Sequence, residues 1–167
     1  MKSCKTLLYA PTLYAGDVSG FNIISDSAYY LWQSMLWNFL ETKKDWDFIW
    51  KGIPRSCHVE DPFQNKKAKN IRYSSNSLKS EFGNADKILL DFPSTPLYEA
   101  ITAEKEILCF SLFGSEFIRS NVRDRVSIPK DPDQALSFID HFLNDRYKIK
   151  QKSKLKKNNI DWKKIVM

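Results

Sequence analysis

The sequence predicts an α/β domain built on a doubly wound, mainly parallel six-stranded sheet flanked by helices. Three observations predict it. Short apolar runs alternate along the chain with segments whose apolar residues are spaced for a helix. The run KILLDF (Lys87–Phe92) is apolar at successive positions, as a strand buried on both faces should be. The 167 residues, 43% of them hydrophobic, are enough for one core. Such alternation is typical of βαβ units with right-handed crossovers.

The first half of the chain predicts three strands and one helix. The strands are apolar runs, mostly bounded by proline, glycine or asparagine: Lys5–Ala10, Asp47–Lys51 and Ile71–Ser74. Between the first two, apolar residues recur from Tyr30 to Leu40 at helical spacing, and Asp26 or Ser27 would cap that helix. Its apolar face and the neighbouring strands would bury four indoles in the core: Trp32, Trp37, Trp46 and Trp50.

The second half continues the same alternation. Its expected strands are Lys87–Phe92, Glu106–Phe110 and Arg125–Ile128. Helices are expected at Ser77–Ala85, Thr95–Glu104 and Gly114–Val122, and after Asp131 as far as Phe142. Pro96 falls in the first turn of one of them, where proline is tolerated.

The positive charge is concentrated at the C-terminus. Residues 148–167 hold eight lysines and one aspartate, a formal charge of +7, so the rest of the chain carries −1 of the net +6. We therefore expect a folded domain at 1–147 and a basic tail at 148–167. The tail is either a solvated terminus or a contact to an anionic membrane surface or a partner. A nucleic-acid binder would more often show a basic folded face, so no nucleic-acid partner is expected.

Several classes of protein are disfavoured. No apolar run approaches the length of a membrane span. The three cysteines form no CxxC pair, which is typical of a reduced, cytoplasmic setting. No GxGxxG or GxxxxGK[ST] motif is present, which argues against NAD-dependent dehydrogenases and P-loop proteins. With two histidines, a His-rich metal site is not expected.

The segment after the fourth expected strand is the main candidate site. In open α/β sheets, ligands bind beyond the carboxyl ends of the strands. Here Ser94 and Thr95 begin a helix, where main-chain amides and the helix dipole favour an anion, and Glu99 follows one turn later. The same residues would also suit a simple helix cap with an acid in the first turns, and local signals leave both alternatives open.

Two other polar clusters are weaker candidates. Lys66, Lys67 and Lys69 form a basic group that could meet phosphate or remain a solvated loop. His58 lies close to Glu60 in the sequence, but residues adjacent in a loop do not define a catalytic set. We expect His141, on the last helix, to be structural.

A family resemblance strengthens the phosphate interpretation. The run NADKILLDFPSTPLYEAITAEKEILCF (Asn84–Phe110) resembles the donor-binding segment of GT-B glycosyltransferases, in particular CDP-glycerol glycerophosphotransferases and surface-carbohydrate transferases. The resemblance implies that Ser94 and Thr95 contact the donor diphosphate and that Glu99 holds the ribose or glycerol part. Asp91 matches the aspartate that precedes the pair in that family.

Two upstream segments are also similar to this family. LLYAPTLY (Leu7–Tyr14) resembles the run that opens its donor domain, which implies that Thr12 lies close to the phosphates. WKGIP (Trp50–Pro54) resembles the run after its second strand; Lys51 is kept and would contribute positive charge, whereas Ile53 stands where the family has a histidine. The resemblance implies one Rossmann-like half of a GT-B enzyme.

The expected function is donor binding in a transferase. The donor would be a nucleotide-activated sugar or polyol phosphate, used for surface polysaccharide or a teichoic-acid-like polymer. No DxD-like acidic pair follows a strand, which fits transfer without a metal or cofactor. A partner chain would supply the acceptor half, and the tail would bring a cytoplasmic protein to the inner membrane face. The alternatives are a non-catalytic regulatory or scaffold domain, or the donor half of an epimerase-like two-domain fold.

Overall fold

The computed structural model describes residues 4–12, 25–52, 60–112 and 118–146. The basic tail at 148–167, the division into domain and tail, and the predictions for Ile53 and His58 lie outside these residues.

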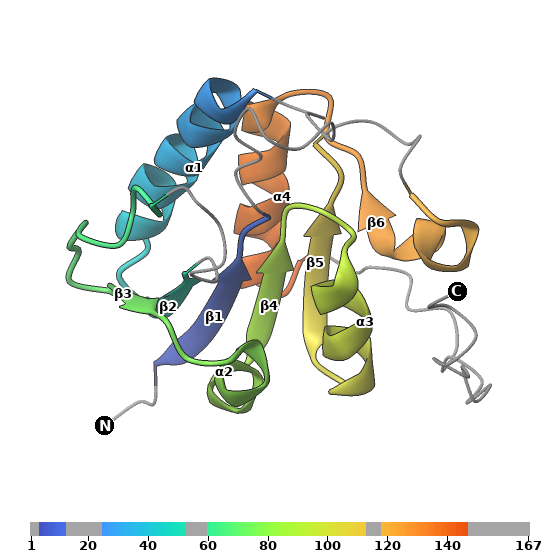
Figure 1. The fold of residues 1–167 in the computed structure, drawn as a ribbon, viewed down its shortest axis with the longest axis horizontal. Helices are drawn as coiled ribbons and strands as arrows, with labels where there is room; N and C mark the ends of the chain where they lie inside the picture. Colours follow the sequence, from blue (N-terminus) through green and yellow to red (C-terminus); the bar gives the residue numbers. More distant parts are fainter. Residues whose placement is uncertain (1–3, 13–24, 53–59, 113–117, 147–167) are drawn as a thin grey trace.

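The described residues form a sheet of six strands, all parallel, in the order β3-β2-β1-β4-β5-β6 (Figure 1). The strands are β1 (Lys5–Ala10), β2 (Trp46–Lys51), β3 (Ile71–Ser74), β4 (Lys87–Leu90), β5 (Glu106–Phe110) and β6 (Val126–Ser127). The chain builds the sheet outward from β1 to one edge, then returns to β4 and builds to the other. The predicted doubly wound α/β fold is therefore confirmed, and its sheet is wholly rather than mainly parallel.

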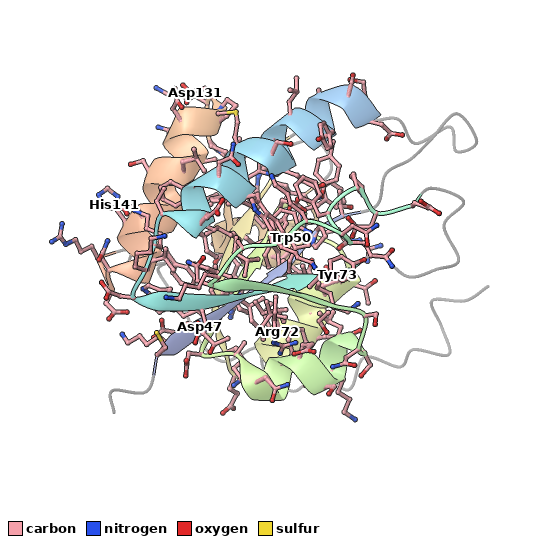
Figure 2. All side chains as sticks on the ribbon, turned by 90° about the vertical axis from the view of Figure 1, so that its left-hand side faces the viewer. Asp47, Trp50, Arg72, Tyr73, Asp131 and His141 are labelled. Atoms are coloured by element: carbon pink, nitrogen blue, oxygen red, sulfur yellow. The ribbon has the colours of Figure 1, made fainter. Side chains whose placement is uncertain are left out.

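Helices cover both faces of the sheet, as the view from the β3 edge shows (Figure 2). They are α1 (Asp26–Glu41), α2 (Leu78–Asn84), α3 (Thr95–Thr102), the 3₁₀ helix η2 (Ser120–Arg125) and α4 (Pro132–Leu143). Helices α1 and α4 pack on one face, and α2, α3 and η2 pack on the other. The predicted first-turn position of Pro96 in α3 and the Asp131 cap of α4 are confirmed.

Each face of the sheet has its own apolar cluster, because alternate strand residues point to opposite sides. The cluster under α1 and α4 is rich in aromatic rings and contains all four predicted indoles: Trp32, Trp37, Trp46 and Trp50. The cluster under α2 and α3 is mainly aliphatic, with Phe82 and Leu97 reaching down from the two helices. The prediction that these tryptophans are core residues is confirmed.

Several predicted boundaries differ from the structure by one or more residues. Neither Asp26 nor Ser27 caps α1: Ser25 does, because its extended backbone lets its Oγ accept the Ala28 N–H at 3.3 Å. Strand β4 ends at Leu90 rather than Phe92, and the side chain of Asp91, the next residue, is buried. Where the helix Gly114–Val122 was expected, the described part is 3₁₀ from Ser120 onward.

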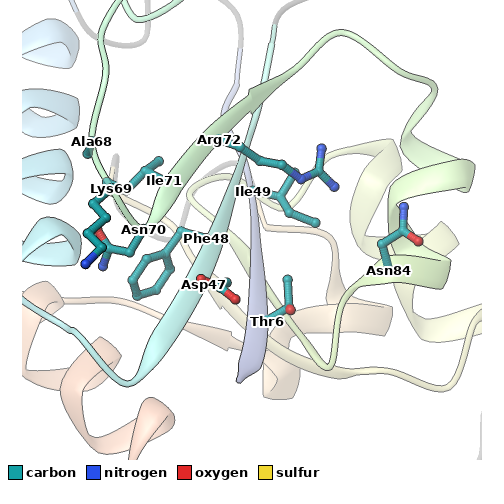
Figure 3. A pocket seen from close by; sticks show the side chains of 10 residues that line it. All are labelled: Thr6, Asp47, Phe48, Ile49, Ala68, Lys69, Asn70, Ile71, Arg72 and Asn84. Carbon is teal, nitrogen blue, oxygen red and sulfur yellow. The ribbon is translucent and has the colours of Figure 1, made fainter. Parts of the chain in front are cut away.

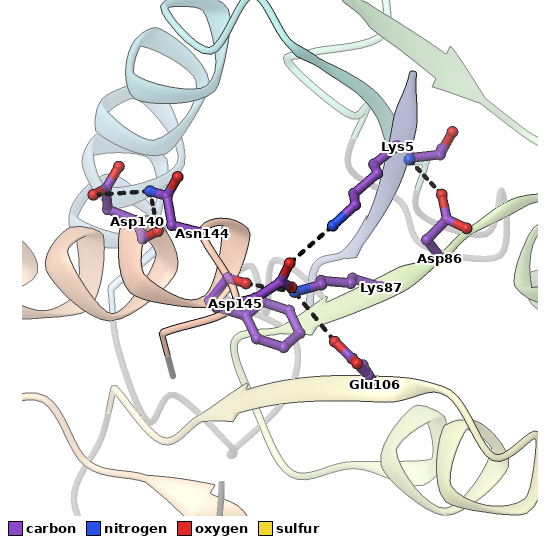
Figure 4. Close-up of polar contacts among 9 residues, drawn as sticks. Lys5, Asp86, Lys87, Glu106, Asp140, Asn144 and Asp145 are labelled. Atoms are coloured by element: carbon purple, nitrogen blue, oxygen red, sulfur yellow. Dashed lines mark hydrogen bonds and ion pairs between the residues drawn. The ribbon is translucent and has the colours of Figure 1, made fainter. Parts of the chain in front are cut away.

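A polar cluster at the amino edge of the sheet ties the end of α4 to three strands (Figure 4). Lys87 in β4 is buried, and its ammonium donates to the Phe142 carbonyl at 2.6 Å and pairs with Asp145 and with Glu106 at 3.1 Å. Lys5 in β1 also pairs with Asp145, at 2.9 Å. This cluster fixes the amino edge and leaves the carboxyl edge, on the opposite side, for a ligand.

Candidate functional site

The carboxyl edge between β1 and β4 is the point where the strand order reverses. From β1 the chain adds strands in one direction, and from β4 it adds them in the other. Connections leave such a point to opposite faces of the sheet, which is where open α/β folds bind ligands. Thr12 follows β1, and Ser94 and Thr95 follow β4. The structure thus brings these predicted residues to the same switch point.

A buried acid joins the two sides of this switch point. The Asp91 side chain, 1% exposed, accepts hydrogen bonds from the Tyr9 hydroxyl, from the Tyr29 hydroxyl at 2.6 Å and from the Thr12 N–H at 2.9 Å. Gln33 donates to the Tyr9 hydroxyl at 3.5 Å. Asp91 therefore serves as a connector within the protein, and no part of it faces a ligand.

Burial dominates the electrostatics of this network. It raises the pKa of Asp91, while the hydrogen bonds from Tyr29, Tyr9 and Thr12 oppose that rise. Burial next to Asp91 also raises the pKa of Tyr9 and of Tyr29 well above the ordinary value. Both phenols therefore stay protonated and available as donors at neutral pH.

Sequence reasoning missed Tyr9, Tyr29 and Gln33. Tyr9 lies inside an apolar strand and Tyr29 on the apolar face of α1, so both resemble ordinary core residues. A weak signal was present in Gln33, a polar residue one turn after Tyr29 on the same buried face. A buried amide needs a hydrogen-bond partner, and that requirement points to a polar network inside the core.

The first turn of α3 offers fewer main-chain donors than the sequence suggested. Ser94 is the N-cap residue, but its side chain makes no capping hydrogen bond, so the simple cap interpretation is not supported. The Ser94 N–H donates to the Phe92 carbonyl at 2.9 Å and the Leu97 N–H to the Ser94 carbonyl at 3.0 Å. Pro96 has no N–H. An anion would thus meet the two hydroxyls of Ser94 and Thr95 and the Thr95 amide.

Glu99 lies on the same side of α3 as Thr95. The two residues are four apart in the helix and both are exposed, so their side chains share one face. This arrangement allows a ligand held by Thr95 to reach the Glu99 carboxylate. The role assigned to Glu99 by the family resemblance stays a prediction.

Lys51 lies farther along the carboxyl edge. It ends β2, two strands from β4, which corresponds to roughly 10 Å at ordinary strand spacing. Its ammonium donates to the Gly52 carbonyl at 2.7 Å, and burial lowers its pKa. The structure therefore places Lys51 beside the site on the β2 side, in contact with its own loop rather than with Ser94 or Thr95.

A cavity of about 410 Å³ lies at the opposite, amino edge of β1, β2 and β3 (Figure 3). Arg72 and Asp47 provide its charged groups on the α2 side, and Thr6 and Asn84 lie near them. The C-terminal end of α2 meets the cavity here, and the dipole at that end disfavours anions. This cavity is therefore a poor site for a diphosphate.

The lysine cluster lies between β2 and β3 in the chain, and His141 lies in α4. Lys66, Lys67 and Lys69 are all exposed, and the Lys66 ammonium lies over the rings of Trp37 and Phe63, at 5.1 and 5.4 Å from their centroids. His141 is an exposed residue in the last turn of α4. Among the described residues, no group of three His, Cys, Asp or Glu side chains could hold a metal ion, and no helix is long and apolar enough to cross a bilayer.

Comparison with solved structures shows a shared fold. The glycotransferase of kitacinnamycin matches with a TM-score of 0.51 and 9% identity, over 80% of this chain and 33% of that chain. The β-Kdo 2,4 transferase KpsC of Thermosulfurimonas dismutans matches with a TM-score of 0.46 and 16% identity, over 66% and 35%. No protein-family model and no curated protein matches the sequence. The chain spans about a third of the length of these solved structures, and its Rossmann-like fold is one that occurs within a glycosyltransferase.

Proposed function

We propose that this domain is the donor-binding half of a GT-B-type transferase. It would bind a nucleotide-activated sugar or polyol phosphate, with the diphosphate at the carboxyl edge between β1 and β4. The observation that carries the proposal is the position of Thr12 after β1 and of Ser94 and Thr95 after β4, at the point where the strand order reverses. The fold shared with a glycosyltransferase supports the same proposal.

The chemistry follows from the groups available. A leaving diphosphate gains negative charge as the transferred group departs, and donors aimed at it lower the barrier. Here those donors would be the Ser94 and Thr95 hydroxyls, the Thr95 amide and the dipole of α3. The Thr12 N–H is engaged by Asp91, so Thr12 would contribute its hydroxyl. Lys51 would add charge at longer range, and Glu99 would accept hydrogen bonds from sugar or ribose hydroxyls.

Calorimetric titration tests this proposal. We expect the chain to bind at least one of CDP, UDP or GDP at millimolar concentration or tighter. Replacing both Ser94→Ala and Thr95→Ala should weaken binding about a hundredfold, since each hydroxyl–anion hydrogen bond is worth ~1.5 kcal/mol. Thr102→Ala is the matched control, because it removes a hydroxyl at the other end of the same helix. Equal affinities in the double variant and the control would refute the phosphate site.

A non-catalytic regulatory or scaffold domain is the second candidate. The specific observation in its favour is the sparse donor set of α3: Pro96 supplies no amide, and Leu97 donates to Ser94. Such a domain would bind a nucleotide without transferring anything. Donor hydrolysis or transfer, measured with membrane extract as the source of acceptor and partner, separates the two candidates: turnover supports the transferase, and binding without turnover supports the scaffold.

Two partners belong to the same proposal. A partner chain with an acceptor-binding half would face the carboxyl edge, because the proposed diphosphate site lies there, between β1 and β4. The basic tail at 148–167 would draw the domain to an anionic lipid surface, near lipid-linked acceptors on the cytoplasmic face. Co-sedimentation with vesicles containing phosphatidylglycerol, compared for the full chain and a chain ending at 147, tests the second point; equal sedimentation of the two would contradict it.

A further inference from the structure

The network around Asp91 holds one peptide segment from both sides. Asp91 accepts the Thr12 N–H at 2.9 Å, and the Tyr29 hydroxyl lies 3.3 Å from the Thr12 carbonyl as well as 2.6 Å from Asp91. Thr12 is the last described residue of the segment that follows β1. Its two polar main-chain groups thus both contact one buried cluster.

Asp91 also lies just before Ser94 and Thr95 in the chain. Only Phe92 and Pro93 separate it from Ser94, and the Ser94 N–H donates to the Phe92 carbonyl at 2.9 Å, which makes this connection a tight turn. The side chain of Asp91 thus fixes Thr12, while its backbone leads directly into Ser94 and Thr95. A single buried residue therefore sets the distance between the two segments that would enclose a diphosphate.

We propose that Asp91 and Tyr29 are positioning residues of the donor site, which set the spacing between Thr12 and the Ser94–Thr95 pair without touching the ligand. The inference rests on the proposed function and deepens it. A misplacement of an ångström in a group that contacts a ligand can cost a large factor in activity, so a rigid link beneath the site has a functional value that its burial alone does not give.

Tyr29 and Tyr9 form a matched pair for the test. Both are fully buried and both donate to the same oxygen of Asp91, but only Tyr29 also contacts Thr12. Tyr29→Phe and Tyr9→Phe each remove one buried hydroxyl and keep the ring. If the network only stabilises the fold, both variants should lower the unfolding midpoint, and their affinities for the ligand should be equal.

Affinity is the first readout. We expect Tyr29→Phe to weaken binding of the best nucleoside diphosphate about tenfold, the equivalent of ~1.4 kcal/mol, and Tyr9→Phe to change it less than about twofold. An equal effect of the two variants would overturn the inference. If the Tyr29 variant fails to fold, Asp91→Asn takes its place in the same comparison, because it keeps the size of the side chain.

Amide hydrogen exchange without ligand is the second readout. We expect the Thr12 amide to be protected in the unaltered chain and to exchange about tenfold faster in Tyr29→Phe, with Leu108 in the core unchanged. An unprotected Thr12 amide would overturn the inference even if nucleotides bind. If no nucleotide binds to the unaltered chain but the Thr12 amide is protected, the proposed function fails, while the conclusion that Asp91 and Tyr29 fix the position of Thr12 stands.

Discussion

Glu81→Gln probes a second buried carboxylate, which holds the connection between β3 and α2. The Glu81 side chain has no exposed surface, and it accepts hydrogen bonds from Arg72 at 2.8 Å, Asn76 at 2.8 Å and Asn84 at 3.2 Å, as well as from the Ser74 hydroxyl. Glutamine has the same shape but no charge, and its amide would face groups that are themselves donors. The substitution therefore removes the charge and leaves the packing in place.

The size of the effect follows from the pKa. Burial pushes the pKa of Glu81 upward, but the hydrogen bonds from Arg72, Ser74, Asn84 and Asn76 outweigh burial and hold the pKa at about 2, against an ordinary value of 4.5. A difference of that size corresponds to ~3 kcal/mol of folding free energy at neutral pH.

The sign of the pH dependence is fixed by the direction of the shift. Because the folded-state pKa lies below the unfolded-state value, the stabilisation is complete above about pH 5 and is lost as the pH falls towards 2. Urea unfolding should therefore show Glu81→Gln less stable than the unaltered chain by ~3 kcal/mol at pH 7, with the two converging near pH 2. Exposed Glu41→Gln is the control, with an expected change within ~0.5 kcal/mol. If the free energies of unfolding of Glu81→Gln and the unaltered chain differ by less than ~1 kcal/mol at pH 7, or if their difference does not shrink in acid, the assigned role of Glu81 is wrong.

Two further substitutions test the packing at the two edges of the sheet. Gly52→Ala should lower the stability of the fold by ~1–3 kcal/mol, because a Cβ there would lie 2.2 Å from the Tyr73 hydroxyl oxygen. Gly83→Ala in α2 is the control and should stabilise the fold slightly, because nothing lies within 4 Å of its Cβ. Thermal unfolding measures both variants, and equal effects would contradict the close approach of Gly52 to Tyr73. Lys87→Met should destabilise by ~1–3 kcal/mol by leaving the Phe142 carbonyl without its ammonium donor. Lys5→Met, in an exposed pair with the same Asp145, should cost much less; a larger loss at Lys5 would contradict the account of the amino edge.

The fold could be predicted because its signals are local. Strands β1, β3 and β5 have the predicted bounds, since apolar runs bounded by turn residues identify buried parallel strands. The position of Thr12, Ser94 and Thr95 at the carboxyl edge also followed from the order of elements, because each of them follows a strand of one parallel sheet.

The interior of the site could not be predicted, because its contacts join residues far apart in the sequence. Asp91 meets Tyr9 across 82 positions and Tyr29 across 62, and no periodic pattern encodes such pairings. The Leu97 N–H differs, because its contact is local: it donates to the Ser94 carbonyl three residues earlier, which removes a donor that the helix start implied. Lys51 was predicted from a short motif, and the structure shows its ammonium on the neighbouring Gly52 carbonyl.

The central claim is that a nucleoside diphosphate binds at the carboxyl edge between β1 and β4. Backbone amide NMR during titration with UDP, CDP and GDP tests it most directly, because each amide reports its own position. We expect at least one of the three nucleotides to shift the amide resonances of Thr12, Ser94 and Thr95. The amide resonances of Thr6 and Asn84, beside the amino-edge cavity, should not change. Shifts confined to that cavity, or none with any of the three at millimolar concentration, would contradict it.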